Sequence, residues 1–210
     1  MASAVLPAAD VGERDVLHPE RLPVDPTGTR APGSWGMVLL IATEAALFAY
    51  LLFSYFYLQS VSTTAWPPGG PPELTLVLPN TAVLLASSGT MWWAERSLRR
   101  GRVGALRLGL LLTLALGVTF LSVQAVEYAK LPFRPQSGAY GALFYTITGF
   151  HGAHVFVGLV VIAVVLVRAA LGHFTAERHL AVTNATWYWH FVDAVWLFVL
   201  TSLYFTPRFT

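Results

Sequence analysis

Five long, predominantly apolar stretches constrain this chain more than any other feature. They lie near residues 35–59, 78–96, 106–128, 140–168 and 181–204. The hydrocarbon core of a bilayer is about 30 Å thick and a helix rises about 1.5 Å per residue, so about 20 apolar residues can cross it. The pattern therefore predicts an all-α, polytopic membrane protein that folds as a bundle of five transmembrane helices.

The overall composition supports this class and excludes several others. Hydrophobic residues make up 55% of the chain and charged residues 11%, whereas soluble domains carry about 25% charged residues. A net charge of +2 without a basic run is not typical of nucleic-acid binding, so we expect no nucleic-acid partner. The absence of cysteine rules out disulfides, cysteine-ligated metal centres and thiol nucleophiles.

The distribution of charge predicts the domain organisation and the orientation. Residues 1–34 are polar and read as a flexible cytoplasmic tail, residues 35–206 form the membrane domain, and residues 207–210 are a short external C-terminus. Lys and Arg gather in the tail and in the loops after the second and fourth stretches, which places those segments in the cytoplasm. The N-terminus is then cytoplasmic and the C-terminus periplasmic. We find no internal repeat, which argues against transporters built from inverted halves.

Ionisable side chains occur at membrane depth on three of the predicted helices. They are Glu44, His154, His190 and Asp193, with His151 three residues before His154. Such groups cost about 2.5–3.5 kcal/mol or more in hydrocarbon unless they are paired or serve a function. We expect an interhelical network of His151, His154, His190 and Asp193 with Glu44 nearby. It either supports proton movement or is a structural network that holds the helices together.

The histidines at membrane depth also allow a metal-site interpretation. His151, His154 and His190 superficially suit zinc or iron, and a haem would need an axial histidine. Because the carboxylates present can pair with the imidazoles equally well, we expect no metal site.

In the loop after the fourth stretch, His173, His179 and Arg168 form a patch that can buffer protons or hold an anionic lipid head group. Glu127 and Lys130 are predicted to form a surface ion pair.

Several segments resemble cytochrome c oxidase subunit III, in that family's order and across about residues 35–206. They are the stretch from Trp35 through Glu44 and Phe48, WPP (66–68), PNTAVLLASS (79–88), QAVEY (124–128), TGFHGAHV (148–155), HFT (173–175) and, most specifically, WYWHFVDAVWLF (187–198). The fuller family form has seven spans with a lipid cleft between the first two helices and the rest. This chain resembles its last five helices, the short bacterial form.

The resemblance implies a subunit without its own redox cofactor. Haem and copper are expected in the partner subunit I, and subunit II and a small subunit IV are further expected partners. The resemblance also implies bound phospholipid, a place in the bacterial inner membrane and membership of a larger respiratory supercomplex. Glu44 matches the family's buried glutamate, and His173 and His179 match a proton-collecting surface. Arg168 matches a residue that contacts a lipid head group. The implied function is support of proton uptake into subunit I of an aa3-type oxidase, and its protection from inactivation during turnover.

Other functions remain open from the sequence. A quinol oxidase or a nitric oxide reductase-associated protein could use a similar subunit. An independent proton channel or transporter would be active alone, and a purely structural scaffold would use Glu44 only for stability.

Overall fold

A computed structural model of the chain describes residues 32–209, and these residues are helical apart from their connecting loops. The helices are α1 (Pro32–Val61), α2 (Val77–Arg99), α3 (Val103–Lys130), α4 (Ala139–Ala170) and α5 (Leu180–Leu200), followed by a π-helical turn, Thr201–Phe205, and a 3₁₀ turn, Thr206–Arg208. The predicted tail falls almost wholly on residues 1–31, which lie outside the described residues, and residues 32–34 already belong to α1.

Proline and glycine residues determine where the helices end. The segment 66–72 contains four prolines and two glycines, and proline lacks the amide hydrogen that a helix interior requires. Gly101 and Gly172 follow α2 and α4 with φ of +73° and +78°, a left-handed conformation that glycine adopts without steric cost. The connection from α2 to α3 is short, residues 100–102, whereas that from α4 to α5 covers residues 171–179.

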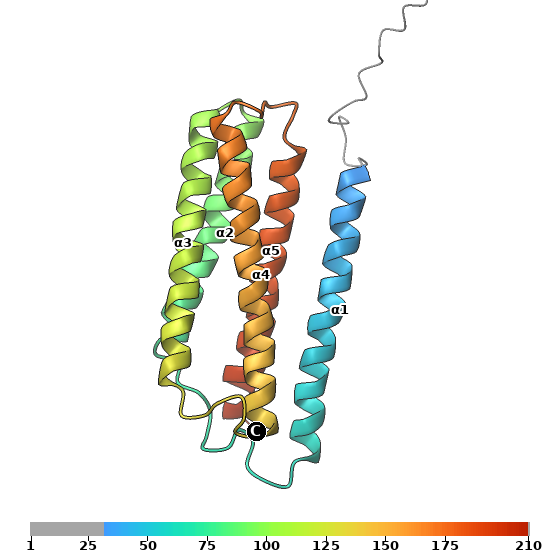
Figure 1. Cartoon of the computed structure of the whole chain (residues 1–210), viewed down its shortest axis with the longest axis vertical. Helices are drawn as coiled ribbons and strands as arrows, with labels where there is room; N and C mark the ends of the chain where they lie inside the picture. Colours follow the sequence, from blue (N-terminus) through green and yellow to red (C-terminus); the bar gives the residue numbers. More distant parts are fainter. Residues whose placement is uncertain (1–31, 210) are drawn as a thin grey trace, which may run out of the picture.

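Helices α2 to α5 form one group, and α1 lies along its side (Figure 1). Within the group α2 packs most extensively on α3, while α5 contacts α1, α2 and α4. Helix α1 contacts only α5 and α4 appreciably, so most of its surface is uncovered in the described part of the chain. An uncovered apolar helix requires lipid or another protein around it.

Four segments of the described residues are long and apolar enough to cross a membrane. They are Gly33–Val61, Val103–Lys130, Ala139–Ala170 and Leu180–Arg208. The expectation of a helical membrane protein is thereby confirmed. Helix α2 is not one of these segments, because Pro79, Asn80 and its several Ser and Thr residues lower its mean hydropathy. Its crossing remains a prediction.

The core of the bundle is built around Trp189, whose side chain is fully buried. A methyl group added at Gly117 or Gly158 would lie 2.9 Å from the Trp189 ring, so these glycines on α3 and α4 make the space that the indole fills. The Trp189 Nε1–H donates to the Ser87 hydroxyl on α2 at 3.0 Å, so the indole nitrogen is satisfied. One residue of α5 thus connects three neighbouring helices.

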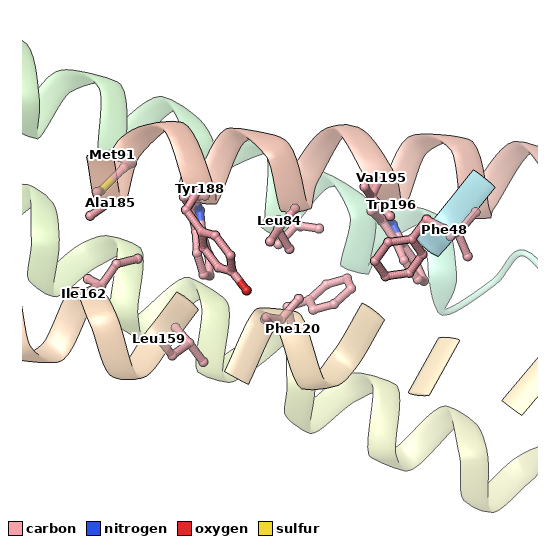
Figure 2. Close-up of a cluster of buried hydrophobic side chains, with 14 of the residues drawn as sticks. Phe48, Leu84, Met91, Phe120, Leu159, Ile162, Ala185, Tyr188, Val195 and Trp196 are labelled. Carbon is pink, nitrogen blue, oxygen red and sulfur yellow. The ribbon is translucent and has the colours of Figure 1, made fainter. Parts of the chain in front are cut away.

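A second layer of large side chains lies one to two turns further along α5. Leu84, Phe120 and Trp196, contributed by α2, α3 and α5, point into the same interior (Figure 2). The Trp196 Nε1–H donates to the Thr81 hydroxyl at 2.9 Å. Large buried aromatic residues with a satisfied polar atom position α5 firmly, and α5 carries two of the predicted site residues.

Candidate functional site

Glu44 and His154 form an ion-pair contact between α1 and α4. Glu44 lies about 18 Å along α1 from Pro32, at 1.5 Å per residue, which is well inside the helix. The Glu44 Oε2 is 2.9 Å from the His154 Nε2, and the two side chains are 31% and 15% exposed. The ring of Phe48, one turn beyond Glu44, meets the imidazole edge-on at 5.1 Å. The sequence predicted both residues but not that they pair.

The hydrogen bonds of His154 fix how many protons the pair holds. Its Nδ1 is 2.7 Å from the backbone carbonyl of Phe150, and since a carbonyl only accepts, Nδ1 must carry a proton. The contact between Nε2 and Oε2 requires one more proton, held by the imidazole or by the carboxyl group of Glu44. In both arrangements the pair is neutral overall, which suits a low-dielectric site. The pair can pass this proton between its two members without changing its net charge.

The pair lies in a mostly apolar groove of about 490 Å³ that α1, α4 and α5 line together. Met37, Leu40 and Val157 contribute apolar wall, and Tyr188 closes the side formed by α5. The Tyr188 hydroxyl donates to the backbone carbonyl of His154 at 3.2 Å, which holds α4 against α5 at this level. The sequence reasoning did not single out Tyr188.

His190 and Asp193 lie on a different part of the bundle, between α5 and α2. The His190 Nδ1 is 2.5 Å from the Ser88 hydroxyl. Asp193 is 4% exposed, and neither of its carboxylate oxygens has hydrogen-bond geometry with a described residue. Ser88 is thus the partner of His190, and no sequence pattern distinguishes it from the other hydroxyls of α2.

His151 is separate from both groups. Its ring is stacked on Trp196, with 4.8 Å between the centroids, and meets Phe120 edge-on. It is 1% exposed, and neither nitrogen has a hydrogen-bond partner among the described residues. An imidazole packed against two aromatic rings fits poorly as the axial ligand of a haem, which would need the space that Trp196 fills.

The predicted polar network therefore divides into three parts, and the expectation that it is one continuous network is wrong. His151 and His154 are three residues apart on α4, yet one faces Trp196 in the core and the other faces Glu44. Helix α1 contacts α4 and α5 but not α2 extensively, so Glu44 reaches His154 and not the Ser88 side of α5. Within residues 32–209, no three His, Asp or Glu side chains converge as a metal-binding group.

The loop between α4 and α5 brings two of its three predicted site residues together. Arg168 and His173 line a pocket of about 550 Å³ with Arg178, and the Arg168 guanidinium lies 5.1 Å from the centre of the Phe174 ring. Two guanidinium groups and an imidazole around one pocket suit an anionic group. His179 is half-buried at the start of α5 and does not line this pocket.

One acidic residue moderates the charge of this loop. The Thr175 hydroxyl donates to the Glu177 carboxylate at 2.8 Å, and this hydrogen bond lowers the pKa of Glu177 below its usual value. Glu177 therefore stays ionised over the neutral pH range. In the sequence, Glu177 directly precedes Arg178, which lines the basic pocket, and lies two residues before His179.

The predicted ion pair of Glu127 with Lys130 is wrong. Glu127 is 6% exposed, and its Oε1 accepts a hydrogen bond of 2.7 Å from the Tyr204 hydroxyl. Lys130 is exposed, one turn further along α3. The π-helical turn that contains Tyr204 continues α5 and directs this hydroxyl toward α3. A deviation from α-helical geometry of this kind has no clear sequence signal.

The family profile described as "Cytochrome c oxidase subunit III" matches residues 14–207. Curated relatives named "Cytochrome c oxidase subunit 3" include those of Scyliorhinus canicula and Danio rerio, each 42% identical over 179 residues, which are 81% of this chain and 68% of the relative. The relative from Cyprinus carpio is 41% identical over the same lengths. The polar residues described above lie within the matched region.

Proposed function

The chain belongs to the cytochrome c oxidase subunit III family, and on this premise we propose that it is the non-redox accessory subunit of an aa3-type cytochrome c oxidase. In this role it supports proton uptake into the haem-bearing subunit I and protects that subunit from inactivation during turnover. Haem and copper are carried by partner subunits. The complex works in a bacterial inner membrane, with subunit II and a small subunit IV as further partners.

The single observation that carries this proposal is the Glu44–His154 pair. A carboxylate at this depth on α1 is held by an imidazole on α4, 2.9 Å away, and both remain partly exposed toward a groove. If the pair served only to hold helices together, we would expect both side chains to be fully buried between helices of this chain. A neutral pair with one transferable proton at the edge of the chain is suited to exchange protons with water or with an adjoining subunit.

The proposal includes five crossings, with the N-terminus in the cytoplasm and the C-terminus in the periplasm. Helix α2 has 23 residues and so a length of about 34 Å, which is enough to span, and it lies along α3 throughout. Its charged residues gather at the end that meets the cytoplasmic loops, where Arg99 pairs with Glu95 at 2.7 Å. The positive-inside rule supports the same orientation.

The loop between α4 and α5 then belongs to the proton-input side. His173 is exposed there and can collect protons, and His179 adds a second imidazole at the start of α5. The pocket of Arg168, His173 and Arg178 is proposed to hold the head group of an anionic phospholipid. A bound lipid would also bring its negative charge close to the two histidines.

Removing this chain from the assembled oxidase tests the proposal. We expect nearly normal visible spectra of the remaining oxidase, because no redox group is lost, but fewer turnovers before it loses activity. The measurement is oxygen consumption followed to inactivation, with the chain added back as the control. An oxidase of unchanged durability and unchanged rate at high pH would reject the proposed role.

A further inference from the structure

His190 presents a hydrogen-bonding atom outward at membrane depth. The residue lies about 15 Å along α5 from Leu180, at 1.5 Å per residue, and it is partly exposed. The Ser88 hydroxyl lies 2.5 Å from the His190 Nδ1, and this is the one hydrogen bond of His190 within the described residues, so Nε2 has no partner there. A lipid tail offers no hydrogen bond, and an unsatisfied polar group in hydrocarbon costs several kcal/mol. Something outside the described chain must therefore satisfy this atom.

The surface around His190 is built from small and apolar side chains. We define the α2–α5 face as Leu85 and Gly89, which flank Ser88 on α2, and His190, Ala194 and Leu197 on α5. All except the partly exposed His190 are exposed, and a methyl group added at Gly89 would meet nothing within 4 Å. Small residues at a membrane helix surface let another helix approach closely.

The polar character of this face continues beneath its surface. Asp193 lies one turn from His190 on α5, is 4% exposed, and has no hydrogen bond to a described residue at either carboxylate oxygen. The Ser88 hydroxyl contacts the His190 imidazole. His190 and Asp193, three residues apart on α5, therefore have hydrogen-bonding capacity that the described residues leave unused on one side of that helix. Such a side is suited to protein or ordered water, and not to acyl chains.

Other exposed faces of the bundle differ in this respect. Away from the Glu44–His154 groove, the outer side of α4 presents Phe156, Val160, Val164 and Val167, all apolar. On α3 the exposed hydroxyls of Thr119 and Ser122 donate to carbonyls of their own helix, at 2.8 Å each. The side chains named here present no unsatisfied hydrogen-bonding group to a lipid tail. The contrast distinguishes the α2–α5 face from its neighbours.

We propose that a transmembrane helix of the haem-bearing partner subunit packs on the α2–α5 face and hydrogen-bonds to the His190 Nε2. The proposal rests on the proposed function, because that function supplies the partner. The partner helix presents a hydroxyl, an amide or a backbone carbonyl opposite His190, and small residues opposite Ala194 and Gly89. The faces of α3 and α4 are left to lipid.

Site-directed photocross-linking in the assembled oxidase tests the docking face. A benzophenone amino acid is placed at Ala194, which is exposed and so tolerates the larger side chain, and a matched probe is placed at Val160 on α4. We expect irradiation of native membranes to join the Ala194 probe to the haem-bearing subunit and the Val160 probe to lipid only. Labelling of lipid alone from Ala194 would overturn the proposal.

A substitution series gives an independent measurement on the same complex. His190→Gln keeps a hydrogen-bonding group in place of the imidazole edge, and His190→Leu removes it. We expect His190→Leu to reduce several-fold the fraction of this chain retained on the oxidase in mild detergent, and His190→Gln to restore most of it. Equal retention of the two variants would contradict the role of Nε2.

The outcomes also separate this inference from the proposed function. If no haem-bearing subunit co-purifies with the chain, the proposed function fails, and this inference fails with it. If such a subunit co-purifies but the Ala194 probe labels only lipid, the docking face alone is wrong and the proposed function stands.

Discussion

His154 on α4 holds the Glu44 carboxylate of α1 at 2.9 Å and thereby joins the outlying helix to the bundle. Among the described residues it is the salt-bridge contact that links two helices, since Arg99 and Glu95 both belong to α2. Helix α1 also contacts α4 and α5 elsewhere, and the Asn184 side-chain amide of α5 donates to the Gly33 carbonyl of α1 at 3.2 Å. The pair is thus both a structural connection and the candidate site for proton exchange, and these two roles make different predictions.

The Glu44–His154 pair should separate stability from turnover. Glu44→Gln keeps an oxygen that accepts from His154 but removes the transferable proton. We expect a chain that still assembles, with slower or less durable oxygen consumption. Glu44→Ala, His154→Ala and the double variant should give a coupling free energy of about 1 kcal/mol in thermal unfolding, reduced by the partial exposure of both groups. Loss of stability with unchanged turnover in Glu44→Gln would indicate a scaffold.

The contact of Gly158 with Trp189 should make even one added methyl group destabilising. A Cβ at Gly158 would lie 2.9 Å from two atoms of the Trp189 ring, and overpacking of this kind costs about 1–3 kcal/mol. Gly149→Ala on the same helix is the control, because its Cβ would meet nothing within 4 Å. Thermal unfolding in detergent should show a lower midpoint for Gly158→Ala and an equal or higher one for Gly149→Ala. The reverse order would contradict the packing around Trp189.

Tyr204→Phe should destabilise the end of the bundle where α3 meets α5. The change removes the hydroxyl that donates to the buried Glu127 carboxylate at 2.7 Å, and a buried acceptor left without its donor costs about 1–3 kcal/mol. Tyr50→Phe is the matched control, because Tyr50 is 75% exposed. Differential scanning of both variants in the same detergent checks the expectation. Equal unfolding midpoints would show that the hydrogen bond to Glu127 contributes nothing measurable.

Replacing His173 and His179 together should slow oxygen reduction most at high pH. Protons are scarce there, so a surface that collects them matters more, whereas at low pH delivery from bulk water suffices. Steady-state oxygen consumption across pH gives the measurement. Glu177→Gln in the same loop is the control for a nonspecific effect on the loop. A loss of rate independent of pH would remove the proton-collecting role.

The helices were predictable from sequence because each depends on local information. Long apolar runs, the prolines of 66–72 and the glycines after α2 and α4 determine their approximate bounds. The individual site residues were also predictable, since an ionisable group such as Glu44 or Asp193 is conspicuous in an apolar run. The signal that identified them was an ionisable side chain located far inside a long apolar run.

The partners of those residues were not predictable, because pairing depends on which helices are neighbours. Sequence spacing placed His151 and His154 on one side of α4, but small differences in rotation put one against Trp196 and the other against Glu44. The place of α1 beside α4 and α5 decides that Glu44 does not reach Ser88. The pairing of Glu127 with Tyr204 depends on a π-helical turn beyond the last regular turn of α5.

The most direct measurement is isolation of this chain from its native membrane in mild detergent, with visible absorption and mass spectrometry of the same fraction. We expect the chain to co-purify in stoichiometric amount with a haem-bearing subunit, and to show no Soret absorption once it is separated from that companion. A chain recovered from the membrane without any haem-bearing companion, or one that retains stoichiometric haem when separated, would contradict its assignment as a non-redox accessory subunit.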